Sequence, residues 1–166
     1  MRVSECIQCN TFPCVDIKTD ANIVPDIEID PALVSLVLIS EAAPEDSSQY
    51  YYAEGTPLFQ QTTLQAFNSA GIAVGSFWDL QEMGVYFSTA VKCAKTGYGI
   101  KAATIKECSL LLEKELGLFP NVKAFLLMGD VAIKAINYIA KRAVGTVRSQ
   151  PDPHIKSGAG ISTSAE

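Results

Sequence analysis

Five cysteines are the residues of this chain whose type and spacing best suit chemistry. Cys6 and Cys9 form a C-x-x-C near the amino terminus, and Cys93 and Cys108 follow in mid-chain. Thiolates at C-x-x-C spacing can reach one metal centre, because a tight turn points both sulfurs to the same side. The first pair is therefore a candidate half of a metal or iron-sulfur site, which the second pair completes if folding brings it close.

Other interpretations of the cysteines stay open. Cys93 and Cys108 can equally be small buried hydrophobes, since free cysteine is among the most buried residue types. Disulfides would leave one of the five unpaired, and no secretory signal precedes them, so we expect a reducing compartment and a cytoplasmic protein. Cys14 is either a spare thiol or a substitute ligand.

The composition predicts one globular domain, which we expect to be a monomer. The chain has 166 residues, of which 48% are hydrophobic, enough for a substantial core. Its longest apolar runs, among them 34–39 and 124–128, are too short to span a bilayer, so no membrane partner is expected. The net charge of −5 gives no general attraction to phosphate, so nucleic-acid binding would need a local basic face.

Alternating strand and helix patterns predict an α/β fold with a parallel sheet. Continuous apolar runs at 34–40, 85–91 and 122–128 are typical of strands covered on both faces. Helices are predicted at 57–71, from about 104 to 117 with Thr104 and Glu107 as a capping box, and to 141 after Asp130 as N-cap. Residues 15–31 lack a sustained period and are predicted to be an irregular connection.

Two further features place the boundaries and the site. Ligands bind at the carboxyl ends of parallel strands, so the loops after Ser40, Val91 and Met128 are the candidate site.

From residue 143 the chain is rich in serine, glycine and proline, which predicts a domain at 1–142 and an irregular tail at 143–166. His154, the only histidine, lies in that tail and is predicted to be solvated.

Several motifs, taken in order, resemble those of the iron-sulfur uracil-DNA glycosylases within the uracil-DNA glycosylase superfamily. I-S-E-A-A-P-E-D at 39–46 is similar to the family's G-E-A-P-G and following E-D, and E-G-T-P-L-F at 54–59 resembles G-x-P-F. V-Y-F-S-T-A-V-K-C at 85–93 resembles V-Y-I-T-N-V-V-K-C, and M-G-D-V-A at 128–132 resembles L-G-x-x-A. The resemblance covers residues 6 to about 141, and the cysteines match the family's cluster ligands in order and approximate spacing.

The resemblance implies a three-layer α/β/α sandwich with a short parallel sheet. It also implies a [4Fe-4S] cluster on Cys6, Cys9, Cys93 and Cys108, with zinc on the same four cysteines as the rival. The implied partner is DNA containing uracil or a damaged base. The implied reaction is hydrolysis of the N-glycosidic bond in base excision repair, after the nucleotide has been flipped into a pocket.

The same resemblance assigns roles to residues near the strand ends. Glu41 is expected to be catalytic, orienting water or stabilising the sugar cation, although a solvated loop acid is the alternative. Phe59 would stack on the flipped base, unless it is a core residue of its helix. The expected substrate-binding residues are Ser40, Ala42, Phe59 and Thr89.

Two departures from the family pattern bear on activity. Thr89 stands where the family has an asparagine that reads the uracil edge, and one hydroxyl cannot pair with an amide edge at two points as a carboxamide does. The family's final histidine motif has no counterpart here. We therefore weigh two hypotheses: a uracil-DNA glycosylase-like protein whose activity is weak or lost, and a non-catalytic iron-sulfur or zinc module that binds nucleic acid or protein.

Lysines around the second cysteine pair are the expected DNA contacts on this acidic chain. The alternative is that they are ordinary surface lysines. These residues are Lys92, Lys95, Lys101 and Lys106.

Overall fold

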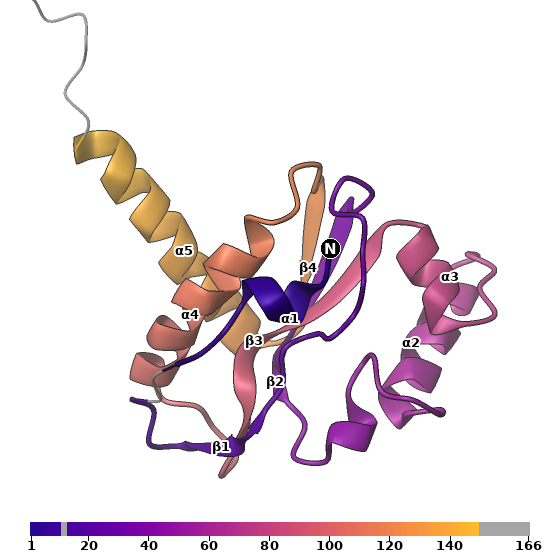
Figure 1. The fold of residues 1–166 in the computed structure, drawn as a ribbon, viewed down its shortest axis with the longest axis horizontal. Coiled ribbons are helices and arrows are strands. Elements are labelled where there is room, and N and C mark those ends of the chain that lie inside the picture. The colour runs from indigo at the N-terminus through magenta and orange to yellow at the C-terminus, as the bar shows by residue number, and fades with distance from the viewer. Residues whose placement is uncertain (11–12, 150–166) are drawn as a thin grey trace, which may run out of the picture.

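A four-stranded mixed sheet organises the molecule, seen in a computed structural model that describes residues 1–10 and 13–149. The strands are β1 (Ile17–Asn22), β2 (Leu36–Ala43), β3 (Val85–Lys95) and β4 (Ala124–Leu127), in the spatial order β1-β3-β2-β4 (Figure 1). β2 lies in the middle of a parallel trio with β3 and β4, as the three apolar runs predict. The α/β fold is therefore confirmed.

The segment predicted to be irregular, 15–31, contains a strand, which corrects the expectation of a purely parallel sheet. β1 pairs antiparallel with β3, with Ile17 opposite Lys95 and Asn22 opposite Cys93. The register shifts between Lys18 and Asn22, so β1 is an irregular edge strand. It extends the sheet beside the carboxyl half of β3, which is longer than predicted.

Helices cover both faces of the sheet. They are α1 (Val3–Cys6), the 3₁₀ turn η1 (Ser47–Gln49), α2 (Leu58–Ser69), α3 (Phe77–Glu82), α4 (Ala102–Leu116) and α5 (Asp130–Ser149). α4 and α5 lie on one side of the sheet and α2 and α3 on the other (Figure 1). No helix in the described ranges is long and apolar enough to cross a membrane.

Alternation of side chains along the strands builds the three layers. Val37 and Ile39 of β2 point into the core that packs against α1, α4 and α5, whereas Leu38 points into the core that packs against α2 and α3. On β3, Tyr86 and Phe87 divide between the same two cores. Both faces of the central strands are buried, which explains why their sequences are continuously apolar.

The helix ends correct some details of the prediction. α5 runs past the predicted boundary at 142 and ends at Ser149, whereas the rest of the predicted tail, with His154, lies outside the described residues. Thr104 does not cap α4, because that helix begins at Ala102 and the Thr104 hydroxyl instead donates a hydrogen bond to Asp16. Asp130 is the first residue of α5 rather than its N-cap.

Candidate functional site: a pocket at the strand ends

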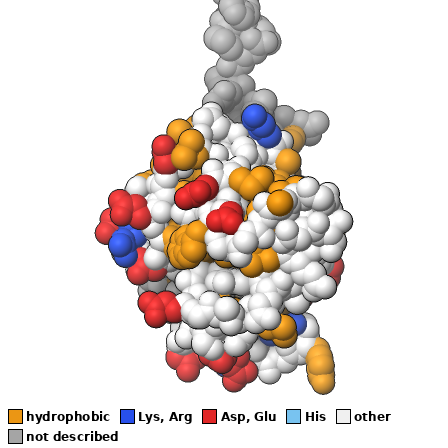
Figure 2. Space-filling view, turned by 90° about the vertical axis from the view of Figure 1, so that its right-hand side faces the viewer, with side chains coloured by type: hydrophobic (Ala, Val, Ile, Leu, Met, Phe, Trp, Pro, Cys, Tyr) orange, Lys and Arg blue, Asp and Glu red, His pale blue; other side chains and the backbone are white. Residues whose placement is uncertain are grey.

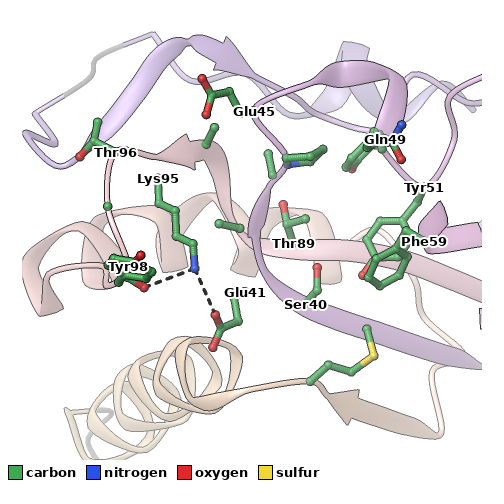
Figure 3. Close-up of a pocket in the computed structure, with 17 residues that line it drawn as sticks. Ser40, Glu41, Glu45, Gln49, Tyr51, Phe59, Thr89, Lys95, Thr96 and Tyr98 are labelled. Atoms are coloured by element: carbon green, nitrogen blue, oxygen red, sulfur yellow. Dashed lines mark hydrogen bonds and ion pairs between the residues drawn. The ribbon is translucent and has the colours of Figure 1, made fainter. Parts of the chain in front are cut away.

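A pocket with a volume of about 840 Å³ opens at the carboxyl ends of the parallel strands (Figure 3). Its walls come from the end of β2, the tyrosine-rich segment after it, the start of α2, the end of β3 with the following loop, and Met128. The pocket therefore lies at the edge where ligands bind in parallel α/β sheets. The five residues predicted to act on substrate all line it: Ser40, Glu41, Ala42, Phe59 and Thr89.

Glu41 sits at the pocket's edge between Lys95 and the start of α5. Its carboxylate lies 3.9 Å from the Lys95 ammonium, which also donates a hydrogen bond of 3.3 Å to the backbone oxygen of Tyr98 (Figure 3). Gly129 packs beneath it, and a Cβ added there would lie 2.5 Å from Glu41 Oε1. With a φ of +105°, Gly129 has the backbone conformation that glycine tolerates best. The glycine before α5 thus leaves room for the Glu41 side chain.

Buried hydroxyls beside the pocket lack a hydrogen-bond partner among the described residues. They include those of Thr89, which is 1% exposed, and Tyr50, and both residues line the pocket. Buried polar groups are normally satisfied, so a partnerless hydroxyl at a cavity marks a place for water or a ligand. Burial also raises the pKa of Tyr50 well above its usual value, which keeps its hydroxyl neutral.

An aromatic wall forms another side of the pocket. Tyr51 meets Phe59 edge to face with 4.2 Å between ring centroids, and Tyr51 also packs on Phe87 of β3. Tyr51 is 3% exposed, whereas Phe59 is 37% exposed. Phe59 is therefore not the buried core residue that its helical position allowed, and part of its ring is free to contact a ligand (Figure 3).

The sequence-based prediction missed three tyrosines that line the pocket: Tyr50, Tyr51 and Tyr98. The first two belong to a Y-Y-Y run that follows the acidic loop, and Tyr98 lies in the G-Y-G of the β3–α4 loop. The Tyr98 side chain is fully exposed. An aromatic ring between two glycines in a loop at a strand's carboxyl end was the signal that could have identified it.

The lysines predicted to contact DNA divide into two groups. Lys95, Lys101 and Lys106 are exposed at the end of β3 and the start of α4. Lys92 is fully buried and forms an ion pair with Glu115 of α4, so the prediction that it contacts DNA is wrong. Its position on β3 points it into the core beneath α4, where no nucleic acid can reach.

The side of the molecule that carries α2 and α3 has few basic side chains among the described residues. Figure 2 shows acidic and hydrophobic side chains on the view that faces α2 and α3, with only scattered lysine or arginine. Exposed apolar residues there include Trp78 and Met83. A polyanion would be repelled less at the β3–α4 loop, where Lys95 and Lys101 lie, than on this side.

The five cysteines do not assemble as their spacing suggests. No group of three or more histidine, cysteine, aspartate or glutamate side chains within residues 1–10 and 13–149 is placed to hold a metal ion. Cys6 is exposed on α1, Cys93 is buried near the end of β3, and Cys9, Cys14 and Cys108 are partly buried. None of the five is in a disulfide. The predicted ligand set Cys6, Cys9, Cys93 and Cys108 therefore does not fit a cluster as the chain is folded here.

Comparison with known proteins finds a partial relative. A stretch of 58 residues is 34% identical to the Type-5 uracil-DNA glycosylase of Thermus thermophilus and covers 35% of this chain. The match spans about a quarter of that protein, 26% of its length. No family model and no solved structure matches the chain. The similarity supports a relationship to the uracil-DNA glycosylase superfamily and no finer placement.

Proposed function

We propose that this chain is a uracil-DNA glycosylase-like protein whose pocket receives a base flipped out of DNA. The observation that carries the proposal is the meeting of Glu41, the partnerless Thr89 hydroxyl and the half-exposed Phe59 ring in one pocket at the strand ends. These groups supply a carboxylate, a polar contact and a stacking face. A flipped nucleotide needs all three.

Glu41 is the group proposed to act on the sugar. Cleavage of an N-glycosidic bond develops positive charge on the sugar and negative charge on the base. The Glu41 carboxylate would stabilise the sugar cation or orient the attacking water from the pocket's edge. Lys95, 3.9 Å away, would contact a phosphate of the bound strand and hold Glu41 in place.

Thr89 and the aromatic wall are proposed to hold the base. The Thr89 hydroxyl would form one hydrogen bond with the base edge, while Phe59, fixed by Tyr51 at its side, stacks on the base. A single hydroxyl reads fewer features than a carboxamide. We therefore propose that the pocket accepts uracil or a damaged base with modest selectivity and that turnover is slow.

Contacts to DNA outside the pocket would come from the β3–α4 loop. Lys95 and Lys101 are exposed there, and Tyr98 projects into solvent beside the pocket mouth. The charges of the two lysines would neutralise phosphates, so the affinity for DNA should fall as the salt concentration rises. We also propose that the protein is cytoplasmic and monomeric.

A cysteine-ligated [4Fe-4S] cluster, or zinc as its rival, is the cofactor that we propose. Bound to thiolates from the amino-terminal segment, β3 and α4, such a group would supply a covalent tie between these three parts of the chain. The resemblance gives the ligands as Cys6, Cys9, Cys93 and Cys108, which would have to move together to bind such a group, because the described structure does not place them as a ligand set.

The test is excision from uracil-containing single- and double-stranded oligonucleotides, followed by alkali to cut abasic sites. Glu41→Gln should abolish strand scission, because the neutral amide cannot stabilise a cation. Glu82→Gln, at an exposed acid at the end of α3, is the matched control and should leave scission unchanged. Scission that survives Glu41→Gln contradicts the catalytic role. Salt-dependent binding without scission by the wild type would favour the non-catalytic module.

A further inference from the structure

The outward face of α3 carries large apolar side chains that remain exposed in the described structure. Trp78 is 55% exposed, and Met83, the residue that ends the helix, is 53% exposed. Phe77 and Leu80 are buried and fix the opposite face of α3 on the core. The inner face of this short helix is therefore fully packed, whereas its outer face leaves apolar surface in contact with water. Exposed apolar surface with a polar border is typical of interaction sites.

The loop before β2 extends this apolar surface at the end of α3. Leu33 lies in that loop and is 60% exposed. The backbone N–H groups of Ser35 and Leu36 donate to the Gly84 oxygen at 2.9 and 3.1 Å. A Cβ added to Gly84 would lie 2.3 Å from the Leu33 oxygen, so the two segments of chain are in direct contact. Leu33 and Met83 thus flank the same contact between the loop and the helix end.

An acidic row borders the apolar surface on its other side. In the segment 25–30, buried apolar residues alternate with exposed acids, so Glu28 and Asp30 share the outer side of an extended chain. The Gln81 side-chain amide of α3 donates to the Glu28 backbone oxygen at 3.3 Å and ties this segment to the helix. Gln81 is three residues after Trp78, so both lie on one face of α3. The Trp78 ring and the acidic row are therefore neighbours.

The carboxylates around the apolar surface are not neutralised within the described structure. Glu82 adds one to the row, because it is exposed four residues after Trp78 on the same helical face. Arg2 pairs with Asp26 at 3.1 Å. No ion pair among the described residues involves the remaining acids, which are Glu28, Asp30 and Glu82. Figure 2 shows acidic and hydrophobic side chains together on the side that carries α3. Such a surface attracts a cation and repels a polyanion.

We propose that this surface binds a basic, amphipathic segment of a partner protein. It is defined by three apolar and three acidic residues, which are Trp78, Met83, Leu33, Glu28, Asp30 and Glu82. Apolar side chains of the partner would cover the apolar centre, and its lysines or arginines would lie against the acidic border, as in protein interfaces with an apolar core and a polar rim. A second copy of this chain would bring the same negative charge and be repelled. None of the six residues lines the pocket, so the inference goes beyond the proposed function.

The fluorescence of Trp78 tests the proposal in the full-length wild type, because Trp78 is the only tryptophan of the chain. The protein is titrated with a synthetic amphipathic peptide of lysine and leucine. A glutamate–leucine peptide and a lysine–serine peptide of the same pattern are the controls. We expect the lysine–leucine peptide alone to shift the Trp78 emission to shorter wavelength and to protect it from acrylamide, with an affinity that falls as salt is added.

The same titration identifies the other possible occupants. No shift with the lysine–leucine peptide, or an equal shift with either control peptide, overturns the proposal. An emission that shifts with protein concentration in the absence of peptide would show that a second copy covers the surface, which also overturns it. Excision of uracil is not measured here, so a failure of the proposed function stays distinguishable.

Matched variants locate the binding surface, with the affinity measured by the anisotropy of a fluorescein-labelled lysine–leucine peptide. Met83→Ser should weaken binding by about tenfold, as for an apolar residue at the centre of an interface. The double variant Glu28→Gln/Glu82→Gln should weaken binding and flatten its salt dependence. Leu110→Ser and Glu107→Gln, at exposed positions of α4 on the other side of the sheet, are the controls and should bind as the wild type does. Unchanged affinity in Met83→Ser, or equal losses in the control variants, overturns the proposal.

Discussion

Lys92 of β3 and Glu115 of α4 form an ion pair in which both side chains are completely buried. The Lys92 ammonium also donates to the Thr89 backbone oxygen at 2.8 Å, and the Glu115 carboxylate accepts from the hydroxyls of Tyr86 and Ser88. Within a buried ion pair, the attraction between the charges and their hydrogen bonds offset the free-energy cost of removing both charges from water. One buried charge without its partner has no such compensation. The pair thus fixes α4 on the strand that carries Thr89 and Cys93.

Removing one member of this pair should destabilise the protein strongly. Lys92→Met leaves a buried, unpaired carboxylate, so we expect a loss of about 3–5 kcal/mol in the free energy of unfolding, measured by urea denaturation. The double variant Lys92→Met/Glu115→Leu should recover much of that loss, because neither charge remains buried. Lys95→Met, at an exposed lysine of the same strand, is the control. A loss below about 1 kcal/mol in Lys92→Met would contradict the structural role.

Gly129→Ala should impair the pocket by displacing Glu41. An added Cβ would lie 2.5 Å from Glu41 Oε1, closer than atoms can pack. Gly71→Ala is a matched control, because Gly71 also has a positive φ of +87° but open space around its Cβ. Both variants should lose stability through backbone strain, about 1–2 kcal/mol. Base excision should fall only in Gly129→Ala, and equal excision in the two variants would argue against the contact.

Tyr98→Ala should weaken DNA binding without changing stability. The ring is fully exposed, so its removal leaves no cavity. If it stacks on a base of the bound strand, the loss should be about 1–3 kcal/mol in binding free energy, measured by fluorescence anisotropy with a single-stranded oligonucleotide. Trp78→Ala removes another exposed ring, from α3 and outside the pocket lining, and should bind as the wild type does. Unchanged affinity in Tyr98→Ala would remove Tyr98 from the interface.

The stability of α3 should depend on pH through Asp79. Ser76 and Asp79 form a capping box, and the hydrogen bond from the Ser76 hydroxyl, followed by those from backbone N–H groups, lowers the pKa of Asp79 below 3.8. A lowered folded-state pKa stabilises the protein above the unfolded-state value and is lost as the pH falls through the folded-state value. Asp79→Asn should therefore lower the melting temperature at pH 7, and this effect should shrink steadily as the pH is lowered through the acidic range. A shift of the same size at every pH would show that the charge has no part.

Local sequence was sufficient for the parallel trio and for the position of Glu41 at a strand end. The apolar runs of β2 and β3 are continuous because both faces of these strands are covered. Each run can therefore be recognised as a buried strand from its own residues alone. Glu41 could be placed at a strand's carboxyl end because it follows the apolar run of β2, whereas Phe59 was expected at the site from the resemblance of E-G-T-P-L-F to a family motif. β1 was missed, since its short irregular edge pairing with β3 joins residues far apart in the chain and leaves no period.

The chain by itself determined which residue types stand at the ends of the strands and that a C-x-x-C precedes a second cysteine pair. Only the tertiary structure decided that Lys92 is buried against Glu115, because a lysine's partner on another element is invisible in local pattern. It also decided which thiols are neighbours. Spacing along the chain sets only an upper limit on the distance between two cysteines. Where the thiols lie depends on tertiary contacts: Val3 anchors α1 in the core, and Asp16 is hydrogen-bonded to the start of α4. As a result Cys14, and not Cys6, packs against the core beneath α4.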